Sequence, residues 1–189
     1  MPFSVAEVRD QRTALKKILA AIEKGSYDPD VRRVALQIVG DCPARDDLCE
    51  LEAIYEAVKH GTDRVPFLKR GVKYVADPRA ADFFTGAKRL LSECAKTGAC
   101  AGDCDDHTIL VGSLAAALGF KVGARAWGPD RGRDVYVHVY PIVAVPKKGP
   151  WPESYTGHGM DTTVKQASVG WEPPRRRVLT AWLDDNEDG

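Results

Sequence analysis

A cysteine stands at the start of a strongly apolar segment. Cys104 belongs to Gly-Asp-Cys-Asp-Asp-His at residues 102–107, and the apolar residues 108–118 follow at once. Unpaired backbone N–H groups at a helix N-terminus favour a thiolate, by about one pKa unit at most. Negative charge nearby disfavours the thiolate, unless the carboxylates that carry it point away or cap the helix. The neighbouring carboxylates are those of Asp103, Asp105 and Asp106. The sequence therefore predicts a nucleophilic thiol that needs a cationic partner.

His138 is the predicted partner and base. It lies in Val-Tyr-Val-His-Val-Tyr at residues 135–140, where strict alternation puts the histidine and both tyrosines on one face of a strand. An imidazolium near Cys104 would stabilise the thiolate far more than a helix dipole does. His158, in a glycine-flanked segment, is the rival base.

Asp161 is the predicted third member, which would hold the histidine ring in one tautomer. It lies in Gly-Met-Asp-Thr-Thr at residues 159–163, and we expect it to open a short strand at 160–164 beside His138. Capping of a turn is its alternative role. A thiol, an imidazole and a carboxylate in these roles attack an amide carbonyl and pass the acyl group to water or to an amine.

A zinc site is the sharpest alternative. Cys94, Cys100, Cys104 and His107 supply a Cys₃His set, but their spacing differs from that of paired zinc knuckles. We therefore expect no metal and no cofactor. A non-enzymatic module with an inert Cys104 is a further alternative. If His107 is not a zinc ligand, we expect it at the surface or in the layer of residues behind the site.

The elements that must position these residues change character along the chain. Apolar residues at three- and four-residue spacing predict helices over residues 5–24, 28–39, 45–59, 79–96 and 104–118. Residues 121–127 and 134–145 flank a turn-forming stretch and predict an antiparallel hairpin, whereas 146–159 predicts an exposed loop. The fold class is therefore α+β, with helices first and an antiparallel sheet after.

The composition excludes several classes of partner. The chain has 189 residues, 44% of them apolar, which suits one domain. Lys+Arg and Asp+Glu balance at 27 each, so no charge excess favours nucleic acid or an anionic membrane. No apolar run approaches the roughly 18 residues of a membrane span, and the N-terminus is charged where a signal peptide is apolar. We expect a cytoplasmic protein that binds a peptide or protein substrate.

The five cysteines form an odd set, so complete internal pairing is impossible. Without a visible signal peptide we expect reduced thiols. Apart from Cys104, we expect them to be small buried apolar residues, namely Cys42, Cys49, Cys94 and Cys100.

Together these motifs resemble the transglutaminase-like superfamily, whose fold is papain-like. The matching pieces are residues 102–106 ahead of a helix ending in Leu-Gly-Phe, a strand with His138, and Asp161 with the two threonines after it. Residues 72–78 also resemble the extended segment that precedes the catalytic helix in bacterial and phage-encoded members. Two features depart from the family: Trp151 stands ten positions before Asp161, and a papain-type glutamine shortly before the cysteine is missing.

The resemblance implies a catalytic triad of Cys104, His138 and Asp161 in a papain-like core. The implied activity is that of a cysteine peptidase or amidase, with a transglutaminase as the alternative; a phage-encoded member would be virion-associated. The single domain then divides into a helical part, a catalytic core and a C-terminal extension with an acidic tail, at residues 1–64, 65–165 and 166–189. Beside the Cys104 N–H, the sequence does not identify the second oxyanion donor, for which Tyr74 and Trp127 are candidates.

Overall fold

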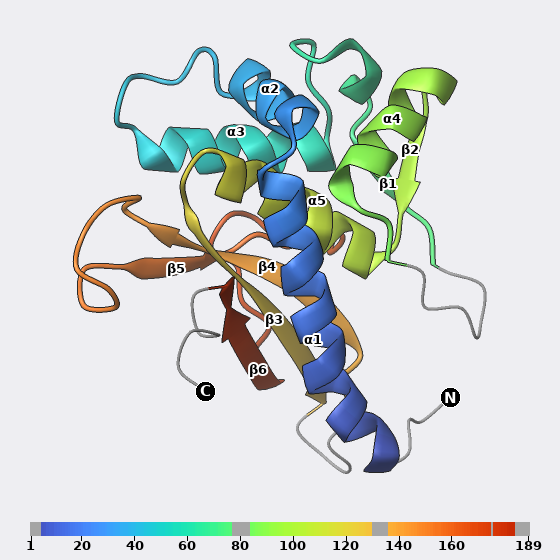
Figure 1. Cartoon of the computed structure of the whole chain (residues 1–189), viewed down its shortest axis with the longest axis vertical. Coiled ribbons are helices and arrows are strands. Elements are labelled where there is room, and N and C mark those ends of the chain that lie inside the picture. The colour runs from blue at the N-terminus through green and yellow to red at the C-terminus, as the bar shows by residue number, and fades with distance from the viewer. Residues whose placement is uncertain (1–4, 77–83, 130–135, 175, 184–189) are drawn as a thin grey trace.

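The computed structural model of the protein describes residues 5–76, 84–129, 136–174 and 176–183 (Figure 1). The described helices are α1 (Val5–Ser26), α2 (Pro29–Ile38), α3 (Asp47–Lys59), the short 3₁₀ helix η1 (Pro66–Leu68), α4 (Ala87–Thr97) and α5 (Cys104–Ala117). The described strands are β1 (Val72–Tyr74), β2 (Cys100–Gly102), β3 (Lys121–Pro129), β4 (His138–Val145), β5 (Thr156–Gly159) and β6 (Arg176–Trp182). The predicted α+β class with an antiparallel sheet is confirmed.

The main sheet has the strand order β5-β4-β3-β6, and every neighbouring pair is antiparallel. The predicted hairpin is present, with β3 and β4 in register from Lys121↔Ala144 to Trp127↔His138. Residues 130–135, which would turn it, lie outside the described residues. A separate parallel pair joins β1 to β2, so the extended segment predicted at residues 72–78 is confirmed over Val72–Tyr74.

Two strands differ from the prediction. β5 lies inside the stretch that was predicted to be an exposed loop, and residues 160–164 are not a strand. β5 has the sequence Thr-Gly-His-Gly, which is poor in strand formers, so its pairing with β4 rather than propensity accounts for the strand. β6 lies in the expected C-terminal extension and pairs with β3. The acidic tail at residues 184–189 lies outside the described residues.

α4 begins later than the spacing of apolar residues predicts. Its first residue is Ala87, and Gly86 before it is extended, with φ −63° and ψ 146°. Residues 79–83 of the predicted helix lie outside the described residues. The Thr85 N–H donates to Asp106 Oδ1 at 2.9 Å, which ties the segment before α4 to the first turn of α5.

α5 is the central helix, and almost all of its residues after the first turn are buried. In Figure 1, α1 crosses in front of α5 and of the sheet. The two helices approach closely at glycines: a Cβ at Gly112 would lie 2.6 Å from Ile22 Cδ1, and one at Gly25 would lie 2.3 Å from Ser113 Oγ. Within the described residues, no helix has the length and apolar character required to cross a membrane.

The start of α5 docks at an edge of β4 that β5 does not cover. β5 pairs with β4 only from Ile142 to Val145. Beyond it, the Met160 N–H donates to the Pro141 carbonyl at 2.9 Å, and the Thr108 hydroxyl of α5 lies 3.2 Å from the Val139 carbonyl. The short strand therefore leaves room beside His138 for the first turn of α5.

Candidate active site

Cys104 is the first residue of α5, and a capping box precedes and follows it. Asp103 Oδ1 accepts the N–H groups of Asp105 and Asp106, at 3.0 and 3.1 Å. Asp106 Oδ2 in turn accepts the Asp103 N–H at 3.4 Å. A Cβ at Gly102 would lie 2.7 Å from Asp106 Cβ, so the glycine is required by this close packing. The carboxylates of Asp103 and Asp106 therefore cap the helix, which was one of the two possibilities left open by the sequence, whereas that of Asp105 lies near the sulfur.

The environment of the sulfur favours the neutral thiol. Burial raises the pKa of Cys104, and the charges of Asp105 and Asp103 raise it further. The Val139 N–H and the Cys104 N–H act in the opposite direction but do not reverse the shift. The helix N-terminus was expected to lower the pKa of the thiol. This effect is weak because the capping carboxylate of Asp103 already accepts the N–H groups of the first turn. The resting group is therefore a thiol, and its sulfur lies 3.8 Å from Asp105 Oδ1.

His138, the first residue of β4, contacts Asp161 directly. Its Nε2 lies 2.7 Å from Asp161 Oδ2 and 3.3 Å from the Thr163 hydroxyl. The ring also packs near Trp127 and Tyr140, with centroids 5.5 and 6.2 Å away. With Nε2 donating to the carboxylate, Nδ1 is the basic nitrogen. Among the hydrogen bonds of the described residues, none joins this ring to the Cys104 sulfur.

Asp161 follows β5 in a turn rather than opening a strand as predicted. Its Oδ1 accepts three donors, the N–H and hydroxyl of Thr163 and the N–H of Val164, at 3.0, 2.8 and 3.2 Å. These bonds close an Asx-type turn, which ends strand pairing. Burial acts to raise the pKa of Asp161, but the hydrogen bonds from His138 and Thr163 outweigh it and leave the pKa below its ordinary value.

The turn after Asp161 is held by α3, about a hundred residues earlier in the chain. The Tyr55 hydroxyl lies 3.0 Å from the Asp161 carbonyl and 2.6 Å from the Ala167 carbonyl. Lys59 Nζ donates to the carbonyls of Val164 and Ala167, at 2.9 and 2.6 Å. Burial lowers the pKa of Lys59, and the Asp161 charge opposes this. The backbone of the turn is thus fixed independently of the sheet.

Of the other two histidines considered, His158 lies apart from this contact, whereas His107 lies behind it. His158 is in β5 opposite Val143, which is five residues from His138 along β4, or about 17 Å in a strand. Asp161 therefore contacts the strand histidine and not the rival base. His107 lies on α5 and is 2% exposed, so the surface position considered for it is wrong. Its Nδ1 lies 2.8 Å from the Thr162 hydroxyl.

Tyr74 and Trp127, the two candidate oxyanion donors, have different positions. Tyr74 ends β1 opposite Gly102, and burial together with the charges of Cys104 and Asp103 raises the pKa of its phenol. Its side chain is therefore near the sulfur, and the residue is 53% exposed. Trp127 lies opposite His138 and packs edge-on against its ring. Of the two, Tyr74 is the one near Cys104.

Four of the five cysteines are paired, contrary to the expected reduced state. Disulfides join Cys42 to Cys49 and Cys94 to Cys100, and Cys104 is free. The Cα atoms of the pairs lie 5.7 and 4.7 Å apart, within the range that a disulfide spans. Because disulfides are rare in the reducing cytosol, this pairing does not support the expected cytoplasmic location.

The Cys₃His zinc hypothesis loses two of its ligands to the Cys94–Cys100 disulfide. Among the described residues, no group of three or more His, Cys, Asp or Glu side chains is arranged to hold a metal. His107, the fourth ligand of that hypothesis, contacts Thr162 instead.

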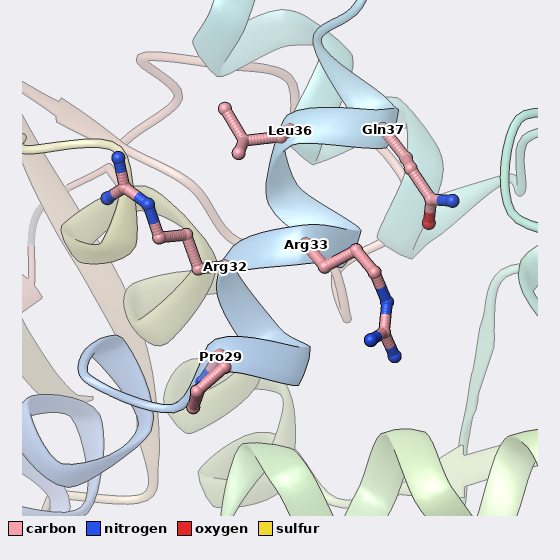
Figure 2. Close-up of a pocket in the computed structure, with 5 residues that line it drawn as sticks. All are labelled: Pro29, Arg32, Arg33, Leu36 and Gln37. Carbon is pink, nitrogen blue, oxygen red and sulfur yellow. The ribbon is translucent and has the colours of Figure 1, made fainter.

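A surface cavity of about 410 Å³ lies along α2, far from Cys104. Figure 2 shows its lining residues, with Arg32 and Arg33 pointing to opposite sides of the helix. Arg32 Nη1 donates to the Ala117 carbonyl at the last residue of α5. The cavity is therefore near the opposite end of a 14-residue helix from Cys104, about 20 Å away.

Several residues around the candidate site have no signal in the sequence. Tyr55 and Lys59 are an ordinary i,i+4 pair on a helix, and only the fold brings them to the turn after Asp161. The contact of Val139 N–H with the sulfur depends on which edge of β4 is uncovered. Thr163 is the exception, because Asp-Thr-Thr is a pattern typical of side-chain-capped turns.

No protein-family model matches the chain, and no curated protein matches it either.

Proposed function

We propose that the protein is a thiol-dependent acyl-transfer enzyme in which Cys104 is the nucleophile, His138 the base and Asp161 the residue that orients the base. The observation that carries this proposal is the 2.7 Å contact between His138 Nε2 and the buried Asp161 carboxylate. It directs one ring nitrogen to the acid and makes the other the base. The one free cysteine of the chain begins the helix that docks beside this histidine.

The neutral resting thiol assigns a specific task to His138. As the Cys104 sulfur bonds to the carbonyl carbon of an amide, its proton passes to His138 Nδ1. Asp161 stabilises the imidazolium that forms. When the C–N bond breaks, the ring returns that proton to the leaving amine, and a thioester remains on Cys104. Hydrolysis by water completes the cycle of a peptidase or amidase acting on a peptide or protein.

The transglutaminase-like, papain-like fold belongs to the same proposal. It is supported by the order of the three residues, by a cysteine at the N-terminus of a buried central helix, and by the histidine on an antiparallel sheet. Transfer to an amine instead of water remains the alternative outcome. Hydrolysis and transfer are distinguished by whether the acyl group of the acyl-enzyme passes to water or to an added amine.

The first prediction concerns the base. Alanine at His138 removes the proton acceptor, so acetylation of Cys104 by p-nitrophenyl acetate near pH 7 should fall about 10²-fold or more. His158→Ala is the matched control and should keep the wild-type rate. Intact mass measures the acetyl group, and Cys104→Ala should gain none. Since the other cysteines are paired, it is the rate of labelling and not its position that tests activation.

The reverse result, with His158→Ala inactive and His138→Ala unaffected, contradicts the proposed base. Acetyl transfer from Cys104 to added primary amines then decides the acceptor. Release of acetate in the presence of millimolar amine identifies a hydrolase, whereas an N-acetylated amine identifies a transferase.

A further inference from the structure

His107 is a buried polar side chain for which the proposed reaction has no task. It lies one turn after Cys104 on α5 and is 2% exposed. Its Nδ1 lies 2.8 Å from the hydroxyl of Thr162, a residue that is itself 7% exposed. A buried imidazole requires such a partner, because its desolvation is otherwise uncompensated. This hydrogen bond links the helix of the candidate nucleophile to the residue after Asp161.

Thr162 stands between Asp161 and Thr163, the two residues that lie within hydrogen-bond distance of His138 Nε2. Asp161 Oδ2 lies 2.7 Å from His138 Nε2, and the Thr163 hydroxyl lies 3.3 Å from the same atom. A shift of Thr162 would therefore displace both contacts together. α3 holds the backbone of this turn through Tyr55, whereas His107 is the contact that comes from the helix of Cys104 itself.

The direction of the hydrogen bond follows from the state of the ring. Burial lowers the pKa of His107 to about 4, while the Lys73 carbonyl and the Asp161 charge act in the opposite direction. The ring is therefore neutral near pH 7 and carries one N–H. Nε2 makes no hydrogen bond of ordinary geometry with the described residues. The Lys73 carbonyl, which acts on this ring, can only accept a hydrogen bond. It therefore favours a proton on Nε2, the ring nitrogen that Thr162 does not contact. Nδ1 is then the acceptor and the Thr162 hydroxyl the donor.

We propose that His107 is a positioning residue, which accepts the Thr162 hydrogen bond and thereby sets the place of Asp161 and His138 relative to Cys104. This inference rests on the proposed function. It identifies a fourth residue of the site that acts through Thr162 and does not touch the substrate.

The test uses the full chain and acetylation of Cys104 by p-nitrophenyl acetate. Thr162→Val removes the hydroxyl with little change of shape, and His107→Leu removes the acceptor. Each should slow acetylation about 10- to 100-fold, because a small misplacement of reacting groups has effects of that size. The double variant should be no slower than either single variant, since both remove the same bond. Thr162→Ser keeps the hydroxyl and should recover most of the rate.

A spectroscopic measurement tests the bond without reference to activity. Long-range ¹H–¹⁵N correlation spectra of the wild type should show His107 with its proton on Nε2 and a bare Nδ1. A proton on Nδ1 overturns the proposed direction of the bond.

The outcomes distinguish failure of the role of His107 from failure of the proposed function. If acetylation depends on His138 but Thr162→Val retains the wild-type rate and loses only thermal stability, His107 is merely structural and the inference fails. Losses that multiply in the double variant also overturn it. If wild-type Cys104 is acetylated no faster than in His138→Ala, the proposed function itself fails.

Discussion

The two oxygens of Asp161 have separate partners, and this division defines the candidate base at the scale of single residues. Oδ1 is held by the donors of Thr163 and Val164, whereas Oδ2 is left to His138. Because Oδ1 fixes the carboxylate, Oδ2 has a defined direction toward the ring. A carboxylate so placed selects the histidine tautomer with its proton on Nε2.

Asparagine at Asp161 should reverse that tautomer. An amide whose oxygen still faces Thr163 presents its NH₂ group to His138 Nε2, so the ring proton moves to Nδ1 and the base is lost. Acetylation of Cys104 should fall by about 10² to 10⁴, with circular dichroism unchanged. Asp105→Asn is the control, because it removes a charge 3.8 Å from the sulfur. It should speed alkylation by iodoacetamide by lowering the pKa of Cys104. A wild-type rate in Asp161→Asn would contradict the assigned role.

Tyr74 is predicted to donate a hydrogen bond to the oxyanion, since its phenol lies near Cys104. Tyr74→Phe keeps the ring and removes the donor, so acetylation should slow about 10-fold or more. Alkylation by iodoacetamide passes through no oxyanion, and its rate should not change. Tyr27→Phe serves as the control, because Tyr27 is 81% exposed. A faster alkylation in Tyr74→Phe would show instead that the phenol restrains the thiol.

At the scale of elements, the first turn of α5 has two functions that conflict. Its capping box stabilises the helix that presents Cys104, but it does so with carboxylates that raise the pKa of the thiol. β1 and β2 lead into this turn, and the parallel pairing of Tyr74 with Gly102 brings the phenol to it. The helix start thus favours the position of Cys104 over its ionisation, and in the proposed mechanism the activation of the thiol is assigned to His138.

Gly102→Ala should disrupt this turn. The added Cβ would lie 2.7 Å from Asp106 Cβ, so the capping box must shift. We expect a loss of about 1–2 kcal/mol in the free energy of unfolding, the scale of a lost cap, together with slower acetylation of Cys104. Gly86→Ser places a capping hydroxyl at the start of α4, where an added Cβ meets nothing within 4 Å, and should not destabilise the protein. Equal stability of Gly102→Ala and the wild type in urea would refute the steric account.

At the scale of the whole molecule, the candidate site is where the helical and sheet parts of the chain meet. α5 carries Cys104 and His107, β4 carries His138, and α3 holds the turn of Asp161. Burial of ionisable groups at this junction makes the stability of the fold depend on pH.

His107 should make the protein less stable in mild acid. Its pKa is lowered from 6.5 to about 4, so between these values the unfolded chain binds a proton that the folded chain does not. The contribution of His107 to the free energy of unfolding is complete above pH 6.5, and it declines by up to about 3 kcal/mol as the pH falls to 4. Asp161 titrates below this window, because its pKa is lowered from 3.8. Urea unfolding from pH 7.5 to 4.5 should therefore show a smaller decline in His107→Leu than in the wild type. Parallel pH profiles would contradict the prediction.

Local patterns in the sequence were enough to predict the helices (apart from the start of α4), the hairpin, and the placement of Cys104 at a helix start and of His138 on a strand. Caps, periodicity and alternation act over a few residues, so they are readable without the fold. Tertiary structure alone decided that Asp161 lies in a turn held by Tyr55, 106 residues away, and that β6 completes the sheet. It also decided the pairing of the four other cysteines and the neutral state of the Cys104 thiol. These properties depend on burial and on contacts between distant segments, which no local pattern encodes.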